Sequence, residues 1–103
     1  MSVDQLGIVD IISVNRETGR VVLTVCDHLD WLDSVRHRTI LQEKFNRYLA
    51  FVESGEIFQR YPNSQGRSIV FKVVFKYSPD REGEKFLKRA RQTVESAGFW
   101  LEY

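Results

Sequence analysis

Six side chains that could serve as metal ligands, general bases or nucleophiles are concentrated in the segment VCDHLDWLDSVRH, residues 25–37. Thiolate, imidazole and carboxylate groups all bind zinc, and a histidine beside a carboxylate can act as a general base. The segment therefore raises three hypotheses: a metal site, a thiol or histidine active site, and a polar loop that caps a helix. The six residues are Cys26, Asp27, His28, Asp30, Asp33 and His37.

The spacing of these residues argues against the first two hypotheses. The chain has one cysteine and no His-x-x-x-His pair, and the three aspartates are three residues apart, unlike the ligands of a calcium loop. No glycine-rich nucleophile elbow or phosphate loop occurs. We therefore expect no metal, no cofactor and no enzymatic activity. The alternative is a small metal-dependent or thiol enzyme centred on Cys26, His28 and His37.

The third hypothesis makes the segment a helix-capping loop. Asp27 would end a strand, and Asp30, Asp33 or Ser34 would cap the following helix, where short polar side chains are preferred. Loops also carry much of protein function, and polar groups beside an aromatic ring are common there. If the protein has a ligand surface, we expect its residues to be Asp27, His28, Asp30, Trp31 and His37.

The preceding and following segments predict how this loop is held. Residues 8–15 and 20–27, IVDIISVN and RVVLTVCD, are rich in β-branched residues and flank a polar connection, which predicts a β-hairpin. Along 20–27 the side chains of Val21, Leu23 and Val25 alternate on one face, which we expect to be buried. Along 8–15 both faces carry apolar residues. Residues 34–53 have apolar side chains at helical spacing, which predicts a helix.

The second half of the chain repeats this alternation of strand and helix. EIFQRY, residues 56–61, could form a short strand, and SIVFKVVFKY, residues 68–77, is the clearest strand in the sequence. Residues 78–98 predict a second helix that begins near Ser78 or Asp80, and FWLEY, residues 99–103, predicts a last strand. Each of the two helices has one apolar stripe that must be buried against another element. We therefore predict an α+β fold, a two-layer sandwich of a mainly antiparallel sheet with two helices packed on one face.

Composition predicts one soluble domain over residues 1–103, with 43% hydrophobic and 28% charged residues. No segment is apolar enough to span a membrane and no signal peptide is evident, so we expect a cytoplasmic protein. A net charge of +1 argues against nucleic acid as a partner. The alternative is a nucleic-acid or anion-binding module that uses the basic residues Lys72, Lys76, Lys85, Lys88 and Arg89.

A sheet covered by helices on one side leaves its other face open. We expect Val70 and Val74 to be exposed there, together with Val22, Thr24 and Cys26. An apolar patch of this kind usually marks a partner surface, and a two-fold dimer uses the same patch twice. The sequence therefore favours a small, non-enzymatic domain that binds protein, with a homodimer through the open sheet face as the simplest form.

Several strings also carry a family resemblance that covers nearly the whole chain. They are VVLTVCDHLDW, LQEKFNRYLAFVESGEI, VVFKYSPDREGEKFL and AGF. With these strings the sequence resembles a family of small uncharacterised bacterial proteins, a domain of unknown function. The resemblance implies a bacterial, stand-alone cytosolic domain. It implies no activity, cofactor or catalytic residue.

Overall fold

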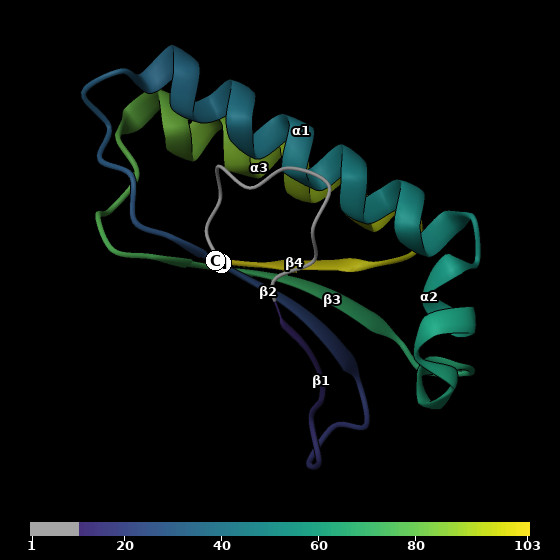
Figure 1. Cartoon of the computed structure of the whole chain (residues 1–103). Helices are drawn as coiled ribbons and strands as arrows, with labels where there is room; N and C mark the ends of the chain where they lie inside the picture. The colour runs from purple at the N-terminus through teal and green to yellow at the C-terminus, as the bar shows by residue number, and fades with distance from the viewer. Residues whose placement is uncertain (1–10) are drawn as a thin grey trace.

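In the part of the chain that the computed structural model describes, four strands form one sheet in the order β1-β2-β3-β4 (Figure 1). The structure describes residues 11–103. The pair β1–β2 is antiparallel, whereas β2–β3 and β3–β4 are parallel. The sheet is therefore mixed, and the prediction of a mainly antiparallel sheet is wrong. The strands are β1 (Ile11–Val14), β2 (Val21–Asp27), β3 (Ile69–Phe75) and β4 (Trp100–Glu102).

The helices explain the parallel pairings. The chain leaves β2 through α1 (Ser34–Glu53) and α2 (Glu56–Arg60) before β3, and leaves β3 through α3 (Arg81–Ser96) before β4. Such helical crossovers bring the chain back to the same end of the sheet, so the joined strands run parallel. Both crossovers step to the next strand in the same direction, so crossovers of one hand place their helices on one face. Figure 1 shows α1 and α3 on the same side of the sheet. The predicted α+β class is confirmed.

The face of the sheet under α1 and α3, here the inner face, carries the core. Val21, Leu23 and Val25 of β2 are buried there, as predicted, and they lie in register with three buried residues of β3. The helices contribute the other half of the core. Phe45 of α1 stacks on Phe86 of α3, with ring centroids 6.2 Å apart. Burial of these apolar faces is the main stabilising term of such a fold.

Side-chain caps define where the two long helices begin. The Asp33 carboxylate accepts a hydrogen bond from the backbone N–H of Arg36 at 3.1 Å, which makes Asp33 the cap of α1. The Asp80 carboxylate accepts one from the N–H of Gly83 at 2.7 Å and caps α3. Each bond satisfies an N–H that the helix itself leaves without a partner. Of the candidate caps predicted from the sequence, Asp33 therefore caps α1 and Asp80 caps α3.

The predicted strand over residues 56–61 is wrong, because α2 and a short 3-10 helix, Pro62–Ser64, occupy this region. Gly55 has φ 81°, a left-handed conformation that lets the chain reverse after α1 and start a second helix. Ile57 is buried and its neighbour Phe58 packs against the core. On a helix, adjacent side chains are only about 100° apart, so both can reach the core, whereas on a strand they point to opposite faces. Residues 8–10 of the predicted hairpin lie outside the described residues.

Candidate functional site

The polar segment begins where β2 ends, and the alternation of the strand decides where its first carboxylate points. Asp27 follows Val25 on the inner face, and it is 1% exposed. Cys26 lies between them in sequence and is exposed on the opposite face. The strand therefore separates the thiol from the carboxylate that follows it.

Asp27 meets His37 of α1 in a buried pair. The His37 Nε2 lies 2.5 Å from Oδ2 of Asp27, and the two side chains are 2% and 0% exposed. The His37 Nδ1 lies 3.0 Å from the carbonyl oxygen of Asp30. A carbonyl oxygen only accepts, so Nδ1 must donate. The Nε2 and Oδ2 atoms form the second hydrogen-bond contact of the ring, so both ring nitrogens of His37 are engaged inside the protein.

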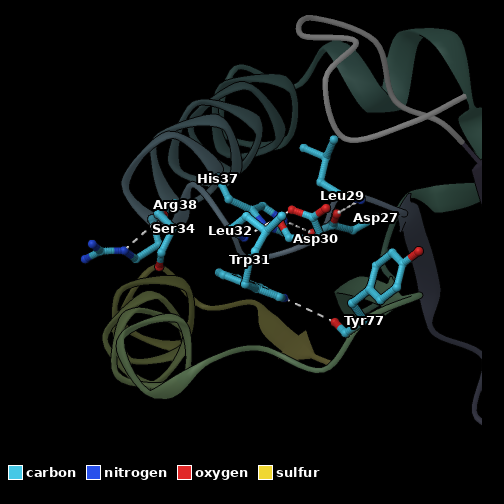
Figure 2. A network of polar contacts seen from close by, with 9 residues as sticks. All are labelled: Asp27, Leu29, Asp30, Trp31, Leu32, Ser34, His37, Arg38 and Tyr77. Atoms are coloured by element: carbon cyan, nitrogen blue, oxygen red, sulfur yellow. Dashed lines mark hydrogen bonds and ion pairs between the residues drawn. The ribbon is translucent and has the colours of Figure 1, made fainter.

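Hydrogen bonds from two aspartates, Asp27 of the pair and Asp30 of the loop, hold the backbone between β2 and α1. Oδ1 of Asp27 accepts a hydrogen bond from the N–H of Leu29 at 3.0 Å, and Oδ1 of Asp30 accepts one from the N–H of Leu32 at 3.1 Å. Figure 2 shows these contacts converging between the end of β2 and the start of α1. The paired groups therefore hold the loop in one conformation, because each buried polar atom needs its partner.

Trp31 covers the pair from the side of α3. Its ring stacks on the imidazole of His37, with centroids 3.8 Å apart and an interplanar angle of 26°. Its Nε1–H donates to the carbonyl oxygen of Tyr77 at 3.2 Å, the long contact drawn in Figure 2. A Cβ added to Gly83 of α3 would lie 2.6 Å from Cζ3 of this ring. Gly83 therefore provides the space in which Trp31 lies.

A polar hollow of about 190 Å³ opens beside this network. His28 and Asp30 are exposed at the hollow, whereas His37 contributes a buried ring. The Asp33 carboxylate at the hollow is engaged as the cap of α1. The polar hollow is lined by His28, Leu29, Asp30, Asp33, Arg36 and His37.

This geometry suits the capping hypothesis better than catalysis. Both ring nitrogens of His37 are engaged inside the protein, so His37 could accept a proton from a ligand only after one contact is broken. Cys26, the proposed nucleophile, lies on the other face of the sheet from His37. Within residues 11–103, no three His, Cys, Asp or Glu side chains are grouped closely enough to hold a metal ion.

The structure brings together most of the predicted ligand surface. The side chains of Asp27, Trp31 and His37 and the backbone of Asp30 form one network, while His28 lies at the polar hollow without joining it. That this surface binds a ligand stays a prediction. The sequence interpretation missed Gly83 and the Tyr77 carbonyl. A glycine inside a helical segment was the available signal for the first, because such a glycine often marks a close packing contact.

The basic residues of the alternative nucleic-acid hypothesis do not form one surface. Lys72 belongs to β3 and alternates with Phe71 and Val73, so its side chain lies on the face away from the helices. Lys85, Lys88 and Arg89 belong to α3, which covers the inner face. Lys76 follows β3 and lies 5.4 Å from the ring of Tyr77. The sheet therefore separates charges that a nucleic-acid surface would need together.

The second candidate surface is the face of the sheet away from α1 and α3, here the outer face. Ile11, Val74 and Trp100 are 52%, 46% and 45% exposed, so each presents apolar area to solvent. The prediction that Val70 is exposed on this face is wrong, because its side chain is only 2% exposed. It lies in register between Val22 and Trp100. Alternation and register assign to the outer face Ile11, Ser13, Val22, Thr24, Cys26, Val70, Lys72, Val74, Trp100 and Glu102.

Comparison with known proteins identifies the family. Residues 1–103 match DUF6572, which is described as a family of unknown function. The chain belongs to this family. No curated protein and no solved structure matches the chain. Membership of DUF6572 confirms the predicted resemblance to a domain of unknown function, whereas the expected bacterial origin stays a prediction. Of the helices in the described part of the chain, none has the length and apolar composition needed to cross a membrane.

Proposed function

We propose that this DUF6572 protein is a non-enzymatic, cytoplasmic binding domain whose outer face binds a second copy of the same chain. The observation that carries the proposal is the apolar area at Ile11, Val74 and Trp100, three exposed residues from three strands of one face. Apolar patches that span a face are costly to leave in water and commonly mark interfaces. A two-fold dimer would cover the same patch on both copies.

The charges of the outer face favour a second copy over another partner. Lys72 and Glu102 are register neighbours on β3 and β4, and both are exposed, so a positive and a negative group lie side by side on a face that also carries Arg20 over the Trp100 ring. The ion pairs recorded for the described residues include neither of them. A surface with both signs can complement itself across a two-fold axis, whereas a surface of one sign repels its own copy.

The polar network supports the non-enzymatic part of the proposal. His37 and Asp27 satisfy each other and the loop, and Cys26 lies on the outer face, apart from both. A nucleophile and its base must lie within hydrogen-bond reach of each other. The three residues of the enzyme hypothesis do not form such a set. The loop instead holds α1 over the inner face and leaves the outer face open.

Sedimentation equilibrium of the wild-type protein and of Val74→Glu tests the proposal. We expect wild type to associate to a dimer as its concentration rises. Val74→Glu should weaken that dimer by roughly tenfold or more, equivalent to about 1.4 kcal/mol, because a charged carboxylate would have to lose its hydration at the interface. The same substitution should leave the fold intact, because Val74 is exposed and Lys72 and Lys76 flank it at alternate positions.

Val35→Glu is the matched control. Val35 is 67% exposed in the first turn of α1, away from the outer face, where an acidic side chain interacts favourably with the helix dipole. This variant should associate as wild type does. Ile11→Glu, at another exposed position of the outer face, should repeat the effect of Val74→Glu. A monomeric wild-type protein, or equal association by all four proteins, would contradict the proposal.

A further inference from the structure

A groove lies between the two long helices, on the helical side of the sheet. It has a volume of about 330 Å³, and we call it the helix groove. Phe45 of α1 and Phe86 of α3 form part of its apolar floor, and Ala90 provides room between the helices because its side chain is short. The helix groove is lined by Gln42, Phe45, Leu49, Phe86, Arg89, Ala90, Thr93 and Val94.

The lining of the helix groove has one charged group. Arg89 is exposed at the groove, and no acidic side chain lines it. The ion pairs recorded for the described residues do not include Arg89, and its neighbours one turn away on α3 are Lys85 and Thr93. The guanidinium therefore offers its fork of N–H donors to any anion that enters the groove.

We propose that the helix groove binds a small apolar carboxylic acid, a free fatty acid of medium chain length. Small-molecule sites have volumes from about 300 Å³ upward, with mostly apolar walls and a few polar groups that fix the ligand. The acyl chain would lie on the floor formed by Phe45, Leu49 and Phe86. Its carboxylate would pair with Arg89, since guanidinium and carboxylate groups form two parallel hydrogen bonds.

The polar hollow beside His37 is a weaker candidate for such a ligand. Asp30 and Asp33 line it beside Arg36, so two carboxylates that repel an acid outnumber the one guanidinium that attracts it. The helix groove also lies on the opposite side of the sheet from the outer face, so the two surfaces act separately. Binding of a fatty acid in the helix groove therefore goes beyond the proposed dimer and does not depend on it.

Titration of the ¹⁵N-labelled full chain with sodium octanoate, followed by amide chemical shifts, tests the proposal. 1-Octanol is the neutral probe with the same chain length. We expect saturable shifts at α1 and α3 residues of the helix groove, and tighter binding of octanoate than of octanol. Arg89→Gln should weaken octanoate binding by roughly tenfold and leave octanol binding unchanged, because only octanoate pairs with the guanidinium.

Arg81→Gln is the matched control, because Arg81 is an exposed arginine of the same helix that does not line the helix groove. It should bind both probes as wild type does. Ala90→Leu should fill the groove and weaken both probes, and its amide spectrum reports whether the fold persists. The proposal is overturned by absence of saturable octanoate binding, by shifts centred outside the groove, or by equal octanoate affinity in Arg89→Gln and wild type.

Discussion

At the scale of single residues, the buried pair of Asp27 and His37 can be traced back to two periodicities in the sequence. Asp27 continues the alternation of Val21, Leu23 and Val25, so its carboxylate points inward. His37 precedes Leu41 by one helical turn, so its ring joins the buried stripe of α1. Both positions were open to prediction from spacing. Their contact was not, because it depends on how the loop between them folds.

Removing one member of this pair should destabilise the protein strongly. His37→Leu would leave the Asp27 carboxylate buried with one of its two partners missing. We expect the free energy of unfolding to fall by about 1–3 kcal/mol, the usual cost of leaving a buried acceptor without its hydrogen-bond partner. Urea unfolding followed by circular dichroism measures the change.

The double variant Asp27→Val/His37→Leu serves as the control, because it removes the buried carboxylate together with the buried imidazole and leaves only the Leu29 N–H and the Asp30 carbonyl without these partners. It should recover much of the lost stability. A single variant that loses less than about 1 kcal/mol, the net value of an ordinary hydrogen bond, would show that the pair is not held as described.

At the scale of elements, the parallel pairing of β2 and β3 brings two loops together. The carboxyl ends of parallel strands meet at one edge of the sheet. The loop after β2 carries Trp31, and the chain after β3 supplies the Tyr77 carbonyl and Gly83. Trp31 thus connects the first turn of α3 to the loop that precedes α1. The chain connectivity that makes the strands parallel also builds this contact.

Gly83→Ala should reverse the usual effect of this substitution. Inside a helix, alanine in place of glycine commonly gains about 0.5–1 kcal/mol. At Gly83 the new Cβ would lie 2.6 Å from the Trp31 ring, and Asp80, the helix cap, would also be close. We expect a net loss of about 1–3 kcal/mol from overpacking, measured by thermal or urea unfolding.

A double-mutant cycle separates this clash from a general change in helix stability. In a Trp31→Leu background the smaller side chain leaves room for the new Cβ. Gly83→Ala should then be neutral or stabilising, since the helix propensity of alanine is no longer opposed. Equal effects of Gly83→Ala in both backgrounds would contradict the assigned role of Trp31.

The fold was predictable where a local pattern decided it. The alternation in β2 and β3 and the stripe of α1 gave the buried faces correctly. Strand direction was mistaken, although a strand, a helix and a strand in sequence are typical of a parallel crossover. The prediction of a strand over residues 56–61 was wrong because a short apolar run fits a helix and a strand equally well. Val70 is buried although it lies on the outer face. Its burial depends on its neighbours on β2 and β4, and a local sequence pattern does not show which residues those are.

At the scale of the whole molecule, the sheet divides the protein into two sides with different properties. The inner side carries the core, the polar network and the helix groove. The outer face carries apolar side chains and charges of both signs, among them Lys72 and Glu102, and the Arg20 guanidinium lies over the Trp100 ring. The net charge of +1 is distributed over both sides, so no large single-signed field opposes self-association. These properties support the proposed association through the outer face.

The reactivity of Cys26 tests this account most directly. Cys26 is the only cysteine, and its side chain is exposed on the outer face of the single chain. Its rate of alkylation by N-ethylmaleimide can be measured by mass spectrometry over a range of protein concentrations. Val74→Glu, in which association should be weakened, gives the reference rate for the open face.

For a dimer through the outer face, alkylation of Cys26 in the wild type should slow as the protein concentration rises through the dimer dissociation constant. In Val74→Glu the rate should stay at the reference value over the same range. A wild-type rate that is independent of concentration, or a dimer that forms without protecting Cys26, would contradict a dimer interface on the outer face.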